Sequence, residues 1–459
     1  MKNPTFTGKE LAEATRGSWR DGRLPAEAVA VYTDTRVAGE GRLFLALPGE
    51  KFDAHDYLAQ AVAAGAGGLC IRRDRTGKLP EPCPVPVLEV DDTLAAYQKI
   101  ANFHRRRFPE LKLVAVTGSV GKTSVKEIVR AILTAASSPE AVLYTEGNTN
   151  NQIGVPQNLL RLDSRHRYAV IEMGTNHHGE IEPLSRMAEP LASLVNSIAP
   201  CHLEFLGSLE GVAREKSHIF CGLPESGAAV IPADGPAVEV LEAAAESYRV
   251  FRFGEDVSRC DVAARYLGGT LEGSRFELSF RTGERFPLEW ALTGRHQARN
   301  AAAAAALAVA IGIPPETIAA GVVHARLPGM RSKVTRLDGV TYVNDAYNAN
   351  PGSMRAALAN LAEFADPVRL VLVLGEMREL GGSEAAEHRA LVENALQTFP
   401  GVRLLTVGRA FGECPGAFRF DRSEEVGETL AKLVRDGDLV FAKGSRGIAV
   451  ELALPEAAR

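Results

Sequence analysis

Near-continuous apolar runs alternate with helical patterns along most of the chain. From Leu111 onward, the runs LKLVAVTG, RYAVIEMG, LASLVNSIA and GAAVIPAD have the character of strands buried on both faces. Segments of helical periodicity lie between them, and KTSVKEIVRAILTAA is the clearest. Strands that alternate with helices predict βαβ units and a parallel sheet. Alternating patterns at 251–292 predict an antiparallel appendage, and the alanine-rich HQARNAAAAAALAVAIG predicts a helix that stops at Gly312 and Pro314.

Two changes of pattern divide the chain into three predicted domains. Residues 1–108 mix short strand patterns with one or two helices, and the last helix ends in the basic run 105–107. Positive residues suit a helix C-terminus, so no nucleic acid is needed to explain this run. A Pro-Gly hinge at 327–329 precedes the further strand patterns VTYVND, RLVLVLG, RLLTVG and LVFAKGS. We therefore predict an α/β protein with domains at 1–108, 109–328 and 329–459, and a mostly parallel sheet in the central one.

The composition agrees with a folded, soluble protein. Of 459 residues, 46% are hydrophobic and 24% are charged, which excludes disordered and fibrous classes. The net charge of −5 supplies no strong cationic field, so neither nucleic acid nor a membrane surface is expected as a partner. No apolar stretch is suited to spanning a membrane. Six scattered cysteines without a CxxC pair argue against a disulfide framework or a zinc knuckle and predict a reduced, cytoplasmic protein.

One loop between a buried strand and a helix is a candidate phosphate site. It reads Thr117-Gly118-Ser119-Val120-Gly121-Lys122-Thr123-Ser124. The glycines let several backbone N–H groups turn toward a phosphate, and the helix N-terminus adds its dipole. Lys122 can reach the β- and γ-phosphates, and the Thr123 hydroxyl can bind Mg²⁺. Val116 replaces the first glycine of the full phosphate-loop pattern. A chance GKT is therefore the alternative, but the strand–turn–helix context favours phosphate binding.

Glu172 is a candidate magnesium ligand because it ends the buried run RYAVIEMG. Ligands bind at the carboxyl edge of open α/β sheets, and carboxylate oxygens suit Mg²⁺. A lone glutamate at a strand end is more often simply solvated. The phosphate loop on a neighbouring strand favours the metal role.

Motifs beyond the phosphate loop resemble those of a known family. They are NTNNQIGVP at 148–156, EMGTNHHGEI at 172–181, GRH at 294–296, DAYNANPGSM at 345–354 and LGEMRELG at 374–381. Together with the phosphate loop, they occur in the order found in the Mur ligases, the ATP-dependent amide-forming enzymes of peptidoglycan precursor synthesis. Their forms look like the branch whose substrates are UDP-N-acetylmuramoyl-tripeptide and D-alanyl-D-alanine. The resemblance implies an N-terminal UDP-substrate domain, a central P-loop ATPase and a C-terminal Rossmann-like domain.

The resemblance also implies three catalytic residues, Lys122, His202 and Lys216. His202 resembles the family's second-metal ligand, and Lys216 resembles a lysine that family members carbamylate. A carbamate replaces a cation by an anionic oxygen ligand, which suits a position beside divalent metals. The alternative is an unmodified lysine that pairs with Glu215 or another carboxylate.

Further residues acquire expected roles from the same resemblance. The expected metal ligands are Thr123, Glu172, His202 and Lys216. The expected nucleotide contacts are the loop 118–124, Asn300, Arg331 and Asp345. The expected substrate contacts are Thr35, Arg36, Asn348 and Asn350. For the two asparagines, turn formation and helix capping are the alternative, and both readings can hold. The loop LGEMRELG follows a predicted strand and is expected in the dipeptide site.

The expected cofactors are ATP and Mg²⁺, the expected partners are the two small-molecule substrates, and we expect a monomer. Other functions remain open from the sequence. One is another Mur-type ligase or a folylpolyglutamate synthetase-like enzyme, and the TDTR and YNANP motifs argue against folate. Another is a P-loop NTPase that drives a partner, and a third is a non-catalytic nucleotide-binding regulator.

Overall fold

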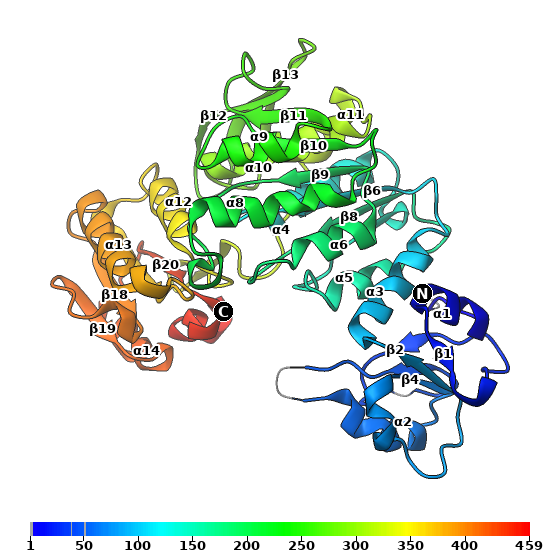
Figure 1. The fold of residues 1–459 in the computed structure, drawn as a ribbon. Coiled ribbons are helices and arrows are strands. Elements are labelled where there is room, and N and C mark those ends of the chain that lie inside the picture. Colours follow the sequence, from blue (N-terminus) through cyan, green and yellow to red (C-terminus); the bar gives the residue numbers. More distant parts are fainter. Residues whose placement is uncertain (1–2, 38, 50–51) are drawn as a thin grey trace.

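The computed structural model describes residues 3–37, 39–49 and 52–459, which form three lobes (Figure 1). Each lobe is built around one sheet, with five, nine and six strands in chain order. In Figure 1 the blue first lobe and the orange last lobe both adjoin the green middle lobe. The predicted three-domain α/β architecture is therefore confirmed.

The first domain has a sheet in the order β1-β5-β4-β3-β2, in which β2 to β5 are parallel and β1 is antiparallel. Its strands are β1 (Ser18–Trp19), β2 (Val31–Tyr32), β3 (Leu43–Leu45), β4 (Gly68–Arg72) and β5 (Val87–Val90), and its helices are α1 (Gly8–Thr15), α2 (Leu58–Ala63) and α3 (Thr93–Arg105). All three residues of β3 are fully buried, as the apolar run around them predicts.

The middle domain has a sheet in the order β14-β13-β12-β11-β10-β9-β6-β8-β7. Its strands are β6 (Lys112–Thr117), β7 (Val142–Tyr144), β8 (Tyr168–Glu172), β9 (Ala192–Val195), β10 (Ala228–Pro232), β11 (Arg249–Gly254), β12 (Val262–Gly269), β13 (Ser274–Phe280) and β14 (Arg285–Trp290). Its helices are α4 (Lys122–Ala135), α5 (Gly154–Leu159), α6 (Ile181–Ala188), α7 (Leu203–Leu206), α8 (Leu209–Ser217), α9 (Val238–Ala245), α10 (Arg295–Ala310) and α11 (Pro315–Val322).

Strand β6 is buried on both faces, as its sequence predicts. Leu113 and Ala115 pack into one hydrophobic core, and Val114 and Val116 pack into the core on the other face. The alanine-rich α10 lies on β10, β11 and β12 and contacts α4. Its small side chains let the helix approach the sheet closely, which explains why six successive alanines are fully buried.

Strands β12 to β14 confirm the antiparallel pairing predicted within 251–292, and they continue the central sheet. β12 pairs in parallel with β11, and β13 and β14 then continue the sheet with antiparallel pairing. Alternation of polar and apolar residues predicts a half-buried strand but does not encode which strand lies beside it.

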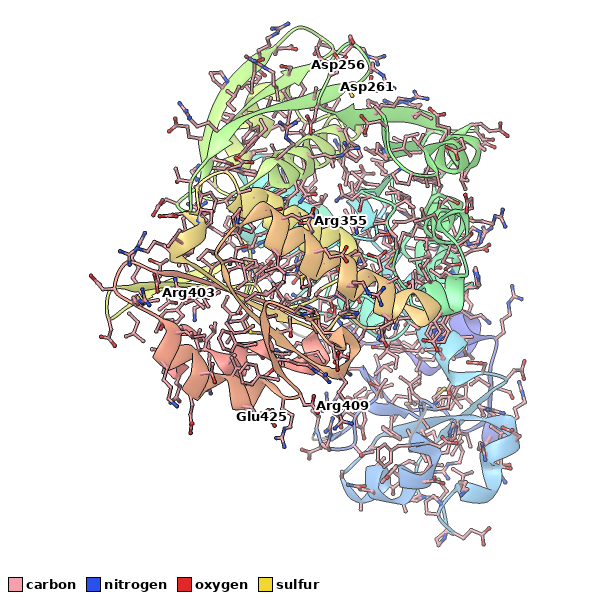
Figure 2. The ribbon with its side chains drawn as sticks, turned by 90° about the vertical axis from the view of Figure 1, so that its left-hand side faces the viewer. Asp256, Asp261, Arg355, Arg403, Arg409 and Glu425 are labelled. Carbon is pink, nitrogen blue, oxygen red and sulfur yellow. The ribbon has the colours of Figure 1, made fainter. Side chains whose placement is uncertain are left out.

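The last domain has a sheet in the order β15-β16-β20-β17-β18-β19, in which β15 alone among the described strands is antiparallel. Its strands are β15 (Lys333–Leu337), β16 (Val340–Asn344), β17 (Leu370–Gly375), β18 (Arg403–Val407), β19 (Ala417–Phe420) and β20 (Leu439–Lys443), and its helices are α12 (Pro351–Leu361), α13 (Glu384–Thr398) and α14 (Val426–Leu433). In Figure 2, Arg355 marks α12 and Arg403 marks β18. Arg403 pairs with the buried carboxylate of Asp438 at 2.7 Å.

The basic run at the end of α3 connects three parts of the chain. Arg105 is buried and donates to the Glu189 carbonyl at 3.3 Å, and Arg106 pairs with the Glu189 carboxylate. Arg107 reaches back to Glu10 of α1 at 2.8 Å. The three guanidinium groups are therefore bound by groups of the protein itself, and their presence does not require a nucleic-acid ligand.

The predicted domain boundaries, 108–109 and 327–329, lie in segments between the sheets. Across the described ranges, every helix is too short or too polar to traverse a lipid bilayer.

Candidate active site

Two sheet edges face each other across a cavity of about 810 Å³. The middle domain contributes residues that follow β6, β8 and β9, and the last domain contributes residues at the ends of β16, β17 and β20. β6 lies between β8 and β9, so the chain crosses from one side of β6 to the other at this edge. Ligands bind at such switch points, at the carboxyl ends of parallel strands. This cavity is therefore the candidate active site.

The phosphate loop joins β6 to α4 at the wall of this cavity. Residues 119–124 line the cavity, and the Gly118 carbonyl accepts a hydrogen bond from Lys122 Nζ at 2.7 Å. Gly121 has a φ of +82°, which glycine adopts without strain. A methyl group there would lie 2.5 Å from Asn196 Nδ2 and 2.7 Å from Asn300 Oδ1. The second glycine is thus required by its conformation and by its neighbours.

Residues after β9 hold the phosphate loop in place. The Val120 N–H donates to Ser197 Oγ at 3.0 Å. Asn196 Nδ2 donates to the Val120 carbonyl at 3.0 Å and to Asn300 Oδ1 at 2.9 Å, while Asn300 Nδ2 donates to Gln297 at 3.0 Å. The loop is therefore preorganised. Asn300, one of the expected nucleotide contacts, lines the cavity, but its side-chain oxygen and nitrogen both make these supporting hydrogen bonds.

Glu172 offers a carboxylate oxygen to the cavity. The residue is 2% exposed, and its Oε1 accepts from Asn150 Nδ2 at 2.9 Å. Its Oε2 has no hydrogen-bond partner among the described residues. A buried carboxylate oxygen is costly unless a cation or a donor binds it. The hydroxyl of Thr123, an expected magnesium ligand within the phosphate loop, accepts a hydrogen bond from the Arg331 guanidinium at 3.0 Å.

The residues around Glu172 fit Mg²⁺ better than a metal held wholly by protein. Within the described ranges, no three His, Cys, Asp or Glu side chains are arranged to hold a metal ion. Mg²⁺ keeps several waters and is usually bound by one or two carboxylates together with substrate phosphates. One partnerless carboxylate oxygen beside a phosphate loop matches that pattern.

His202 connects the middle domain to the last one. It immediately precedes α7, has a φ of +51°, and lines the cavity. Its Nδ1 pairs with the carboxylate of Glu379, and this hydrogen bond lowers the pKa of Glu379. The expected metal ligand is therefore engaged by a carboxylate of the opposite domain.

Lys216 lies in α8 and is 1% exposed. Burial lowers the pKa of its ammonium group to about 8, because the charged form loses its hydration. The carboxylate of Glu215 accepts from three backbone N–H groups at the start of α6, at 2.8–3.0 Å. Glu215 thus caps the start of α6.

The last domain presents an ion pair to the cavity. Lys443 Nζ pairs with Asp345 at 2.6 Å and donates to the Asn348 carbonyl at 3.0 Å. Arg331 stacks on the Tyr347 ring, with its guanidinium carbon 4.0 Å from the ring centre. The two residues expected to contact nucleotide from this domain, Arg331 and Asp345, therefore lie in the cavity wall.

Asn348 and Asn350 both have local structural roles. Asn350 caps α12 through reciprocal hydrogen bonds with Ser353. Asn348 Oδ1 accepts from the Ala349 N–H at 2.9 Å. Both asparagines also line the cavity, so the structure brings them to the site while their substrate contacts stay a prediction.

Lys443 and Asn196 line the cavity but were given no role by the sequence analysis. Each lies at or just after the end of a buried strand, and that position is the signal that could have identified them. His296 also lines the cavity, and burial lowers its pKa to about 4.

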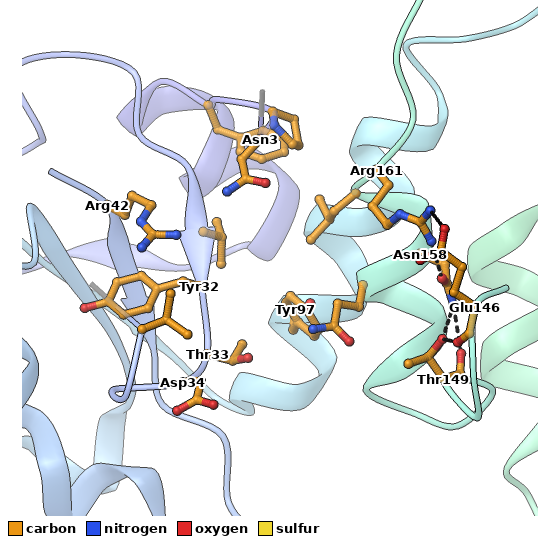
Figure 3. Close-up of a pocket in the computed structure, with 16 residues that line it drawn as sticks. Asn3, Tyr32, Thr33, Asp34, Arg42, Tyr97, Glu146, Thr149, Asn158 and Arg161 are labelled. Carbon is orange, nitrogen blue, oxygen red and sulfur yellow. Dashed lines mark hydrogen bonds and ion pairs between the residues drawn. The ribbon is translucent and has the colours of Figure 1, made fainter. Parts of the chain in front are cut away.

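A second cavity, of about 420 Å³, lies between the first and middle domains (Figure 3). Residues from both domains face it, among them Asn3, Tyr32, Thr33, Asp34, Arg42, Glu146, Asn158 and Arg161. The expected substrate residues Thr35 and Arg36 are not among its described lining residues. Arg36 instead pairs with Asp34 at 2.7 Å and lowers the pKa of that carboxyl to about 2.

Comparisons with known proteins agree with this architecture. The family model for the "Mur ligase middle domain" matches residues 116–308, and the one for the "Mur ligase, glutamate ligase domain" matches 330–446. The UDP-N-acetylmuramoyl-tripeptide–D-alanyl-D-alanine ligase of Escherichia coli (strain K12) is 39% identical over 455 residues, 97% of each chain. The ligase of the same name from Bacillus subtilis (strain 168) is 33% identical, over 97% of this chain and 96% of its own.

A solved structure extends the likeness to three dimensions. Crystal structure I of MurF from Acinetobacter baumannii matches with a TM-score of 0.90 and 32% identity, and the match covers 98% of both chains. The likeness therefore includes the first domain, which lies outside both family models. The chain belongs to the Mur ligase family.

Proposed function

We propose that the protein is an ADP-forming ligase that joins D-alanyl-D-alanine to UDP-N-acetylmuramoyl-tripeptide in peptidoglycan precursor synthesis. One observation carries the proposal. A phosphate loop with a partnerless carboxylate oxygen beside it shares a single cavity with the last domain's sheet edge. The full-length relatives named for this reaction support the choice of substrates.

The chemistry requires an activated carboxylate. A carboxylate is a poor electrophile at neutral pH, so transfer of the γ-phosphoryl group of ATP to the tripeptide carboxylate gives an acyl phosphate. The dipeptide amine then attacks the carbonyl carbon, and phosphate leaves. We propose that Lys122 and the N–H groups of the phosphate loop, which line the cavity, stabilise charge on the transferred group.

Glu172 and the Thr123 hydroxyl would hold Mg²⁺, which supplies positive charge beside the phosphates. Burial favours the neutral amine of Lys216, the form that reacts with CO₂ to give a carbamate. We propose that Lys216 is carbamylated and that, together with His202, it completes the metal ligands. Thr35 and Arg36 are proposed to contact the UDP-substrate, and Asn300, Arg331 and Asp345 the nucleotide.

We also propose a cytoplasmic monomer. All six cysteines are unpaired, which suits a reducing compartment. One chain supplies both walls of the cavity, so the proposed reaction needs no second copy.

The test measures phosphate release by the purified protein with ATP and UDP-N-acetylmuramoyl-tripeptide. We expect release only when D-alanyl-D-alanine is added, and little with D-alanine, L-lysine or L-glutamate. Release with a single amino acid would indicate another Mur-type ligase, and release without any amine would indicate a simple NTPase. With ¹⁸O in the tripeptide carboxylate, one labelled oxygen should appear in phosphate, whereas labelled AMP would exclude the acyl phosphate.

A further inference from the structure

His388 of α13 is a buried histidine outside the cavity wall. It has no exposed surface. Its Nε2 lies 2.8 Å from the Met377 nitrogen, and its Nδ1 lies 2.7 Å from the Glu384 carbonyl oxygen. An N–H group only donates and a carbonyl only accepts, so the ring is neutral and carries its proton on Nδ1. Phe411 packs edge-on against it, with centroids 4.7 Å apart, which fixes the ring's orientation.

His388 provides the middle one of three successive anchors for the loop after β17. The Glu376 N–H donates to the Val407 carbonyl at 2.9 Å, at the end of β18. The Met377 N–H donates to His388, and the Arg378 N–H donates to Ser445 Oγ at 3.1 Å, just after β20. Three neighbouring elements therefore hold three consecutive backbone groups.

The anchored loop brings opposite charges to the cavity. Arg378 and Glu379 both line it, and Glu379 pairs with His202 across the domain boundary. A free dipeptide is a zwitterion, with an ammonium group at one end and a carboxylate at the other. A carboxylate and a guanidinium at neighbouring positions complement those two ends. Any shift of Met377 would move both side chains.

We propose that His388 is a positioning residue for the incoming dipeptide. By accepting the Met377 N–H, it holds the loop so that Arg378 and Glu379 face the charged ends of the dipeptide. This inference rests on the proposed function. His388 anchors Met377 and contacts neither the phosphate loop nor the proposed nucleotide residues Arg331 and Asp345, so loss of this anchor should affect the dipeptide and leave the nucleotide almost unaffected.

The test compares two substitutions with a matched control. His388→Phe keeps a ring of similar shape against Phe411 but removes the acceptor, whereas His388→Gln keeps an acceptor near the position of Nε2. The control is His104→Phe, which removes a buried imidazole that contacts the Leu162 carbonyl at 2.9 Å, far from the loop in sequence.

For His388→Phe we expect the KM for D-alanyl-D-alanine to rise about tenfold, because one buried N–H loses its acceptor. The KM values for ATP and UDP-tripeptide should change by less than about twofold, which separates a local effect from general damage. His388→Gln should recover most of the dipeptide affinity, and His104→Phe should leave the dipeptide KM unchanged. An unchanged dipeptide KM in His388→Phe, or equal rises for all three substrates, would overturn the proposal.

Amide hydrogen exchange of the whole protein without substrates provides the second measurement. The amides of 376–378 should exchange faster in His388→Phe than in the parent, while those of the phosphate loop should not. Unchanged protection at 376–378 would overturn the role of His388. If the parent protein releases no phosphate in response to D-alanyl-D-alanine, the proposed function itself is overturned. The hydrogen-exchange result would then still show whether His388 holds the loop in place.

Discussion

Replacing Gly121 by alanine tests whether the phosphate loop depends on both its backbone conformation and the amides beside it. The left-handed φ of +82° makes any side chain unfavourable, at a cost of about 1–2 kcal/mol. The new methyl group would also lie 2.5 Å from Asn196 Nδ2 and 2.7 Å from Asn300 Oδ1. Moving these groups breaks one or both hydrogen bonds of Asn196, at about 1 kcal/mol each. The expected loss of stability is therefore about 2–4 kcal/mol.

Gly312→Ala is the matched control. Gly312 lies in the same domain with a φ of +84°, and a methyl group there would meet no atom of the described residues within 4 Å. It should therefore show the backbone cost alone, about 1–2 kcal/mol, and bind nucleotide normally. Gly121→Ala should in addition bind ATP up to about 100-fold more weakly, since the loop is displaced. Denaturant unfolding and titration calorimetry measure the two effects. Equal stability losses and equal ATP affinities in the two variants would refute the role of the Asn196–Asn300 contact.

Three further outcomes are expected. Lys122→Ala should lower the ligase rate about 10²–10³-fold without loss of fold, measured by phosphate release and circular dichroism; a near-parental rate would show that Lys122 is not a phosphate contact. Lys216→Ala should lose activity and regain part of it with acetate or propionate, which can supply the missing oxygens; full activity without them would exclude the carbamate. The depressed pKa of His296, about 4 against about 6.5 unfolded, gives stability that is fully present above pH 6.5 and falls as the pH drops toward 4. His296→Asn should thus lose less unfolding free energy than the parent between pH 7 and pH 5, and an identical loss in both would contradict the assignment.

The fold was largely predictable because its main strands are apolar at nearly every position. In β17, Leu372 packs into one core and Val371 and Val373 into the other, so the run contains no polar residue that would indicate an exposed face. The phosphate loop was equally predictable from the sequence, since all its residues are adjacent along the chain. The antiparallel strands at 251–292 were recognised from their alternation, but their attachment to β11 was not.

Pairs that join distant segments could not be predicted in the same way. Lys443 and Asp345 are 98 positions apart, and no local pattern encodes which strand ends meet. His202 and Glu379 belong to different domains, so their pairing depends on how two sheets dock. Glu215 shows that neighbours in sequence can also be misleading as predicted partners. Its sequence context suggests a partner for Lys216, whereas the backbone N–H groups of residues 179–181, at the start of α6, donate to its carboxylate.

Two contacts join the middle and last domains at the cavity, one from Arg331 to Thr123 and one from His202 to Glu379. The binding site is therefore formed by both domains together. A ligand that touches both domains binds their closed arrangement more tightly than an open one, and it therefore stabilises the closed arrangement by that difference in binding free energy. By reciprocity, whatever separates the walls weakens that ligand by the same factor. The loop at Gly381 lies directly against Glu204 of α7 on the other side of this junction. A compound lodged between them would separate the two walls and thereby weaken the binding of every ligand that touches both.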